Sequence, residues 1–239
     1  MVDADEPCEG RQESGARVSF TVITAPQRSS EWFAARLGRV TGTAASDVLA
    51  TIKSGEAAAR RDLRARLVAE RLSQTPQEDV FVNEAMAWGV AHEDEARIAY
   101  ELHSGFQVQE TGFLAHNDLM AGVSLDGHIG DYVGLIEIKA PKTATHLQTL
   151  REGIPARHMA QLTHALWMVP QADYLDFVSY DPRLPERLRL VVHRVMRHDV
   201  DVTGYGMKLL KFLEEVDAEV AALRTMANLG AVLTASLER

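Results

Sequence analysis

Two acidic residues and a lysine fall within a short stretch of the chain at a spacing that suits catalysis. Asp126 precedes a Gly-Asp turn at 130–131, and Glu137 and Lys139 follow that turn in a strand-like segment. Because side chains alternate between the faces of a strand, Glu137 and Lys139 should point to one side, about 7 Å apart. The turn should bring Asp126 beside Glu137, where two carboxylates and strand carbonyls form an oxygen site suited to Mg²⁺ or Mn²⁺. With Lys139 to orient or deprotonate a water, or to stabilise developing negative charge, such a site can hydrolyse a phosphodiester.

The same spacing also has a plainer interpretation, an exposed hairpin that carries a Glu–Lys pair on one face. A bare D-x(10)-E-x-K pattern occurs by chance in many proteins, so other polar residues must support the catalytic interpretation. Glu93 lies on a partly apolar helical stripe, where a carboxylate is unfavourable unless it is paired or bound to a metal. Arg97, four residues further on, is the salt-bridge partner that would make Glu93 merely structural.

Two further groups of polar residues allow either interpretation. The guanidinium of Arg36 suits a phosphate if the following loop folds over it, and otherwise it is a solvated helix end. Arg157, Gln161 and His164 form a polar stripe on an otherwise apolar helix. That stripe either faces a site or is the wet face of the helix.

Periodicity and capping residues predict helices alternating with strands, and no internal repeat or linker divides the chain. The helices are expected at 31–37, 44–52, 57–73, 84–103 after an Asn83 cap, 143–151, 155–168 and 203–226, and the strands at 106–114, 120–129, 132–139, 172–180 and 188–198. This order predicts the α/β class, with a mixed central β-sheet flanked by helices. We expect a flexible acidic N-terminal tail over 1–26 and a single domain over 27–239 that ends in a long C-terminal helix.

The composition is that of an ordinary globular protein, with 239 residues of which 46% are hydrophobic and 25% charged. One cysteine, Cys8, excludes an internal disulfide and a thiolate metal cluster. No apolar run approaches the roughly 18 residues of a membrane span. The acidic N-terminus lacks the apolar region of a secretory signal, so we expect a soluble intracellular protein.

The formal net charge of −9 argues against a protein that coats nucleic acid, but the charge is unevenly distributed. Acidic residues dominate the two ends of the chain, whereas 53–72 and 183–198 are rich in arginine. The simplest interpretation of 53–72 is a helix with a solvated basic face.

Five short motifs follow one another along the chain. They are Trp32 with Arg36-Leu37-Gly38-Arg39-Val40-Thr41, then Trp88-Gly89-Val90-Ala91-His92-Glu93, Ser124-Leu125-Asp126-Gly127, Glu137-Ile138-Lys139-Ala140-Pro141, and Met159-Ala160-Gln161 through Trp167. In this order they resemble the lambda exonuclease and YqaJ-type viral recombinase family of the PD-(D/E)XK nuclease superfamily. The resemblance covers about residues 29–198 and implies a restriction-endonuclease-like core.

The resemblance also implies roles for individual residues. Asp126 and Glu137 would bind the catalytic Mg²⁺ or Mn²⁺, helped by the backbone carbonyl of Ile138. Glu93 would complete the metal site directly or through water, and Lys139 would serve the attacking water. The residues expected at the 5′-phosphate and the DNA are Arg36, Thr43, Ser124, Gln161, His164 and Lys142.

The implied activity is a metal-dependent exonuclease of linear double-stranded DNA. By resemblance it would digest from 5′ to 3′ as a homotrimer ring and leave 3′ overhangs for a phage-type single-strand annealing protein, in the cytoplasm of a bacterium or phage-infected host. Two other functions stay open from the sequence. One is a catalytically degenerate nuclease fold that binds DNA or assembles, and the other is a single-strand-specific RecB- or Cas4-like nuclease without an iron–sulfur cluster.

Overall fold

The computed structural model describes residues 20–77 and 84–237, and within them eight strands form two four-stranded sheets. Both sheets are mixed, with orders β1-β3-β4-β2 and β5-β6-β7-β8. The strands are β1 Phe20–Ile23, β2 Val40–Thr41, β3 Phe113–His116, β4 Ala121–Ser124, β5 Gly127–Ile129, β6 Gly134–Lys139, β7 Tyr174–Tyr180 and β8 Leu190–Met196.

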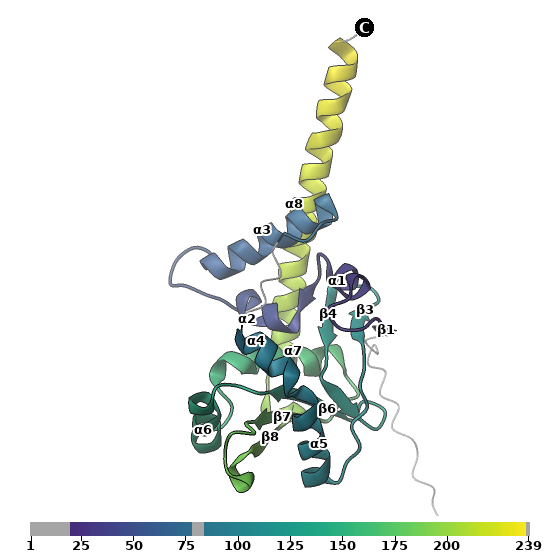
Figure 1. Cartoon of the computed structure of the whole chain (residues 1–239). Helices are drawn as coiled ribbons and strands as arrows, with labels where there is room; N and C mark the ends of the chain where they lie inside the picture. The colour runs from purple at the N-terminus through teal and green to yellow at the C-terminus, as the bar shows by residue number, and fades with distance from the viewer. Residues whose placement is uncertain (1–19, 78–83, 238–239) are drawn as a thin grey trace, which may run out of the picture.

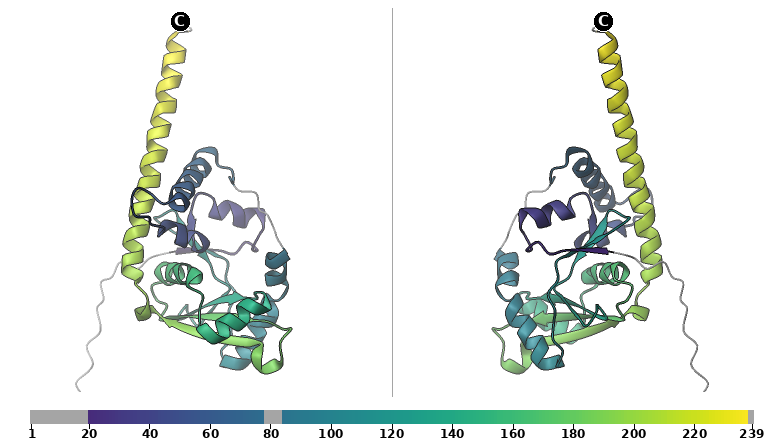
Figure 2. Two further views of the ribbon diagram at one scale, coloured as in Figure 1. Left: turned by 90° about the vertical axis from the view of Figure 1, so that its left-hand side faces the viewer. Right: turned by 90° about the vertical axis from the view of Figure 1, so that its right-hand side faces the viewer.

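Helices cover both sheets, and the last of them continues well beyond the body of the molecule (Figures 1 and 2). The helical elements are α1 Ser30–Arg36, η1 Gly42–Ala44, α2 Ala45–Val48, α3 Ala58–Ser73, α4 Glu84–Ala91, α5 Glu93–Ser104, α6 Thr143–Glu152, α7 Ala156–Met168, η2 Glu186–Leu188, η3 Arg197–Asp199 and α8 Val202–Leu237. In the described part of the chain, no helix is both long and apolar enough to cross a membrane.

Helices α5 and α7 cover opposite faces of strand β6, so each of its side chains faces one of these two helices. Ile136 and Ile138 pack with α5 in one apolar cluster, whereas Leu135 belongs to the larger core that includes α7. Glu137 therefore faces α7, since alternate residues share a face. The predicted alternation along this strand is confirmed, but its polar face is covered by a helix rather than exposed.

The chain crosses from one sheet to the other between β4 and β5. The buried side chain of Leu125 and the adjacent Asp126 occupy the crossing, because β4 pairs with β3 while β5 pairs with β6. The turn that follows β5 contains Gly130 and Tyr132, both with positive φ. Asp126 is thus held at the junction of two sheets.

The predicted α/β class is confirmed, and several predicted element boundaries are wrong. The strand expected at 120–129 is split by the crossing, and the one expected at 106–114 forms a ladder only from Phe113 onwards. The helix expected at 84–103 is interrupted at His92, while the one expected at 44–52 is reduced to η1 and α2. The Asn83 cap lies outside the described residues.

Both ends of the domain also differ from the predictions. Strand β1 lies within the segment assigned to a flexible tail and pairs with β3 in antiparallel register. Helix α8 continues to Leu237 rather than ending near 226. Residues 1–19 lie outside the described part, so the rest of the tail prediction stays untested.

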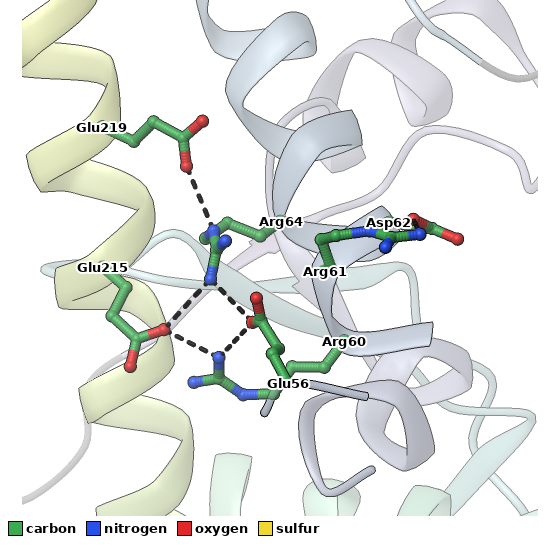
Figure 3. A network of polar contacts seen from close by, with 7 residues as sticks. All are labelled: Glu56, Arg60, Arg61, Asp62, Arg64, Glu215 and Glu219. Carbon is green, nitrogen blue, oxygen red and sulfur yellow. Dashed lines mark hydrogen bonds and ion pairs between the residues drawn. The ribbon is translucent and has the colours of Figure 1, made fainter. Parts of the chain in front are cut away.

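The basic segment 53–72 does not present a solvated basic face, because its arginines meet acidic residues of α8 (Figure 3). Arg60 Nη1 lies 2.8 Å from Glu215 Oε2, and Arg64 Nε lies 3.1 Å from Glu219 Oε2. Both arginines also contact Glu56 Oε1 at 2.6 Å. These acids neutralise the arginines within the chain and fix α3 to α8.

We expect Glu215→Gln to lower the free energy of unfolding at pH 7 by about 1 kcal/mol, the order of a partly buried charged hydrogen bond. A hydrogen bond from Arg60 holds the pKa of Glu215 below its ordinary value. This stabilisation is therefore present above the unfolded pKa, about 4.3, and is lost as the pH falls through the folded pKa. Urea unfolding of parent and variant at several pH values measures it.

Glu214→Gln is the matched control, since Glu214 is the preceding, exposed residue of the same helix and forms no ion pair with a described residue. An equal loss of stability in both variants would contradict the role of the Glu215 contacts.

Candidate active site

A cavity of about 520 Å³ lies between β6, α7, the start of α5 and the loop before α1. Nine of the residues predicted from the sequence line it: Arg36, Thr43, Glu93, Ser124, Asp126, Glu137, Ile138, Lys139 and Gln161. They come from segments far apart in the chain, so the fold gathers them into one place.

Two carboxylates form the centre of the cavity. Glu137 is only 3% exposed, and its Oε1 accepts hydrogen bonds from Gln161 Nε2 at 2.5 Å and from Lys139 Nζ. Asp126 Oδ2 accepts a hydrogen bond from the backbone N–H of Ile138 at 2.6 Å. The strand that carries Glu137 therefore also anchors Asp126.

Burial shifts the pKa values of two carboxyl groups in the cavity. Burial and the neighbouring Glu137 raise the pKa of Asp126 to about 8. Burial also raises the pKa of Glu93, although Lys139 and Arg28 oppose that shift. Burial would lower the pKa of Lys139, but the attraction of Glu137 and Asp126 outweighs it and raises that pKa. A divalent cation would relieve the repulsion between the carboxylates.

The residues present fit a magnesium or manganese ion held by few protein ligands. Asp126, Glu137 and the Ile138 carbonyl would supply hard oxygen ligands, the kind these ions prefer. Among the described residues, no three His, Cys, Asp or Glu side chains converge closely enough to hold an ion. Glu93 would complete the site directly or through water, and a water-mediated contact suits Mg²⁺ because this ion retains several waters.

One end of the cavity is built to receive an anion. The Arg36 guanidinium lies 4.0 Å from the centre of the Trp32 ring, and its Nη1 donates to Ser124 Oγ at 3.0 Å. Burial and the charge of Arg66 lower the pKa of Arg36 to about 10, so it remains charged at neutral pH. A partly desolvated, planar cation next to hydroxyl groups suits a phosphate. It is not a solvated helix end.

Local geometry explains how Ser124, Thr43 and Gln161 reach the cavity. Ser124 is the last residue of β4 and Asp126 lies just beyond it at the crossing between the sheets, and both line the cavity. Thr43 Oγ1 lies 3.3 Å from Thr41 Oγ1, which places the hydroxyl of η1 beside Arg36. At Gly42 a Cβ would lie 3.3 Å from Gln161 Cγ, so a larger residue would crowd this glutamine.

The prediction that His164 contacts DNA is wrong. His164 is completely buried, its Nε2 donates to the Gly122 carbonyl at 2.9 Å, and its Nδ1 accepts from Tyr205 Oη at 2.7 Å. Burial lowers its pKa to about 4, which keeps the ring neutral. His164 is a core residue that joins α7 to β4 and α8.

Two other expectations are changed by the structure. Lys142 is exposed at the start of α6 and does not line the cavity, so it stays only a predicted DNA contact. Arg97 pairs with Asp94 at 3.0 Å and with Glu110 at 2.9 Å. It therefore leaves Glu93 facing the cavity instead of forming the alternative salt bridge.

The sequence interpretation missed His158 and Arg28, and it gave Arg157 no role. His158 lies three residues before Gln161 on the same face of α7, and that spacing was the available signal. Arg28 has a φ of 70°, a conformation that L-residues rarely adopt, and it also lines the cavity. No periodic pattern marks such a loop residue.

Comparison with known proteins identifies the family. Residues 31–173 match the YqaJ-like viral recombinase domain. The chain belongs to the YqaJ-like viral recombinase family. The resemblance inferred from the five motifs is thereby confirmed.

Solved structures of exonucleases share the architecture of this chain. An alkaline exonuclease, LHK-Exo, from Laribacter hongkongensis is 36% identical, with a TM-score of 0.74 over 84% of this chain and 98% of that one. Its complex with dAMP gives the same identity and TM-score and is covered over its whole length. A phage related exonuclease from Haemophilus somnus 129PT, 13% identical with a TM-score of 0.61 over 79% of this chain and 96% of that one, shares the fold. No curated protein matches the chain.

We expect Asp126→Asn to stabilise the metal-free protein at alkaline pH. The folded pKa of Asp126, about 8, is above its unfolded value, so its ionisation opposes folding and stability falls as the pH rises toward 8. The asparagine keeps an acceptor for the Ile138 N–H without the charge. Melting temperatures at pH 5 and pH 9 measure the difference.

At pH 9, added Mg²⁺ should make the parent more stable than Asp126→Asn, because the parent binds the ion and the variant has lost one of its ligands. At a metal concentration of 100 times Kd the parent should gain about 2.7 kcal/mol. The exposed turn residue Asp131, changed to Asn, should respond as the parent does. Equal magnesium stabilisation of Asp126→Asn and parent would show that the ion binds elsewhere.

Proposed function

We propose that this chain is a divalent-metal-dependent exonuclease that degrades one strand of linear double-stranded DNA from its 5′ end and leaves 3′ overhangs. The observation that carries the proposal is the buried Asp126–Glu137 pair with Lys139 at its side, in a cavity whose end carries Arg36. The 36% identity to an alkaline exonuclease supports the same reaction. Because the set Glu93, Asp126, Glu137 and Lys139 is complete, a catalytically degenerate module is disfavoured.

The metal, when bound, would polarise the scissile phosphate and lower the pKa of an attacking water. The side chains around it hold the reacting groups in position. Gln161 fixes the carboxylate of Glu137 through its amide, so that the carboxylate does not rotate away from Asp126. Lys139 stays protonated because its carboxylate neighbours raise its pKa. It therefore orients water as a hydrogen-bond donor and stabilises developing negative charge, rather than acting as a general base.

The proposed 5′ to 3′ direction comes from the family resemblance, and the Arg36 end of the cavity supports it. Arg36, Ser124 and Thr43 offer one guanidinium and two hydroxyls, which suit a terminal 5′-phosphate because it has more charge and more free oxygens than an internal one. Anchoring that phosphate would place the next phosphodiester over Asp126 and Glu137. Digestion then proceeds stepwise from the 5′ end.

The assembly and the cellular context are part of the same proposal. A homotrimer ring around DNA, a single-strand annealing partner and a cytoplasmic location follow from the family resemblance. Light scattering of the purified protein measures the number of subunits.

The activity is tested with 5′-phosphorylated linear duplex, circular duplex and single strands, each with Mg²⁺ and with EDTA. We expect digestion of the linear duplex with Mg²⁺ only, release of mononucleotides and survival of the circle. Digestion of the circle at the same rate would indicate an endonuclease. Preference for single strands would favour the RecB- or Cas4-like alternative, and no cleavage at all would leave a binding module.

We expect Arg36→Ala to slow digestion of 5′-phosphorylated duplex much more than digestion of 5′-hydroxyl duplex. The expected loss is about 1.5–3 kcal/mol, the value of a hydrogen bond to a charged group. Initial rates on both substrates at one salt concentration measure it, since phosphate contacts depend on salt. Arg187→Ala, at an exposed position in η2, is the control for charge. Equal slowing on the two substrates would contradict recognition of the terminal phosphate.

A further inference from the structure

The cavity continues past the carboxylate pair, and the function proposed above assigns nothing to that far end. Thr145, Arg157, His158 and Phe177 line the cavity there, and the charges of Lys139 and Arg157 reach the His158 ring. Ser124, which binds Arg36, and Asp126 directly precede β5, whereas His158 packs on Phe177 of β7. Strand β6 with Glu137 lies between β5 and β7, so His158 and Arg36 lie on opposite sides of Glu137. A DNA strand whose 5′ end is bound at Arg36 would therefore reach the residues around His158 after it passes Asp126 and Glu137.

Strand β6 and helix α7 lie next to each other and determine where these lining residues are placed. Along β6 the side chains facing the cavity are Glu137 and then Lys139. Along α7, Gln161 contacts Glu137, and His158 lies one turn nearer the start of the helix. Lys139 follows Glu137 on β6 and bonds back to it, whereas His158 lies one turn from Gln161 on α7, within reach of the charges of Lys139 and Arg157.

The His158 ring is fixed by packing, but its two ring nitrogens are available for a ligand. Its ring packs on Phe177 at 5.2 Å between centroids, and Phe177 is the β7 partner of Glu137 in the sheet register. No hydrogen bond joins the ring nitrogens of His158 to another residue in the described part of the chain. A neutral imidazole still carries one N–H donor, so this ring can donate to a ligand oxygen.

The neighbours of His158 favour an anion. Arg157 is exposed beside it on α7, and the charge of Lys139 reaches the ring. Thr145 adds a hydroxyl from the first turn of α6. An exposed guanidinium, a hydroxyl and a ring N–H without a partner among the described residues form a set that binds phosphate oxygens, and the nearby charge of Lys139 favours an anion there.

We propose that His158 and Arg157 form a subsite for the phosphate immediately downstream of the scissile one, the third from the 5′ end of the digested strand. This inference rests on the proposed function. Phosphates recur at regular intervals along a strand, at least about 3.4 Å per nucleotide, so a row of three sites holds three successive phosphates. The first lies at Arg36, the second at Asp126 and Glu137, and the third at His158. The subsite fixes the register of the strand and determines which bond is cut.

The test replaces the third phosphate of the digested strand by a neutral methylphosphonate. Release of the first nucleotide is measured in a single turnover with excess enzyme and Mg²⁺. For the parent we expect this substrate to react about tenfold more slowly than the native one, as the loss of one charged hydrogen bond gives. A methylphosphonate far downstream in the same strand should have no effect.

Variants of the enzyme show whether His158 and Arg157 read that phosphate. His158→Phe keeps a ring against Phe177 but removes the donor, and His158→Asn retains a donor. On the native substrate, His158→Phe and Arg157→Ala should each slow release, whereas on the modified substrate they should add little, because the partner is already absent. His158→Asn should recover part of the difference in release rate between the native and the modified substrate. The exposed Arg151→Ala on α6 should behave as the parent does.

The outcomes separate this inference from the function on which it rests. If the unmodified duplex is not digested, the proposed function fails and the subsite with it. If the duplex is digested and the parent tolerates the methylphosphonate, the subsite alone is wrong. The subsite is equally wrong if His158→Phe keeps the full discrimination, since a general loss of folding or activity would leave that ratio unchanged.

Discussion

The carboxylates of Asp126 and Glu137 lie together in the interior of the protein, and the arrangement of the surrounding elements depends on keeping them there. Burial, together with repulsion from the neighbouring Glu137, raises the pKa of Asp126 to about 8. Without a metal, Lys139 and the amide of Gln161 supply the opposing donors to Glu137. The rest of the site holds these groups against that repulsion.

The fold meets this constraint through rigid elements rather than loops. Asp126 lies at the crossing between two sheets and is tied to β6 by the Ile138 N–H. Helix α7 covers the polar face of β6, and the buried His164 holds that helix to β4 and α8. The ion pairs between α3 and α8 hold together two helices that both contribute to the same apolar core (Figure 3). A site that must keep two carboxylates together is more precise when it is built on such elements.

Features that depend on local spacing could be predicted from the sequence. The alternation along β6 predicted that Glu137 and Lys139 share a face opposite Ile136, and the turn after β5 predicted the approach of Asp126. The family resemblance added Arg36 and Gln161, which local spacing could not connect. Nine of the predicted positions line one cavity as a result.

Features that depend on distant partners could not be predicted in this way. The arginines of α3 are neutralised by acids some 150 positions later in the sequence, as the pair Arg64–Glu219 shows at a separation of 155 residues. His164 has the same polar character as Gln161, and only its burial against Tyr205 shows that it belongs to the core. The predicted strand over 120–129 is two strands because tertiary pairing, not propensity, divides it at Leu125.

The position and chemistry of Asp126 and Glu137 predict that they together form a divalent-cation site. Anomalous diffraction from a crystal of the protein grown with Mn²⁺ at alkaline pH tests it most directly. We expect a manganese peak bound by both carboxylates and the Ile138 carbonyl, with Glu93 bound directly or through water. A manganese-containing crystal with no peak between these carboxylates, and with Lys139 still bound to Glu137, would contradict it.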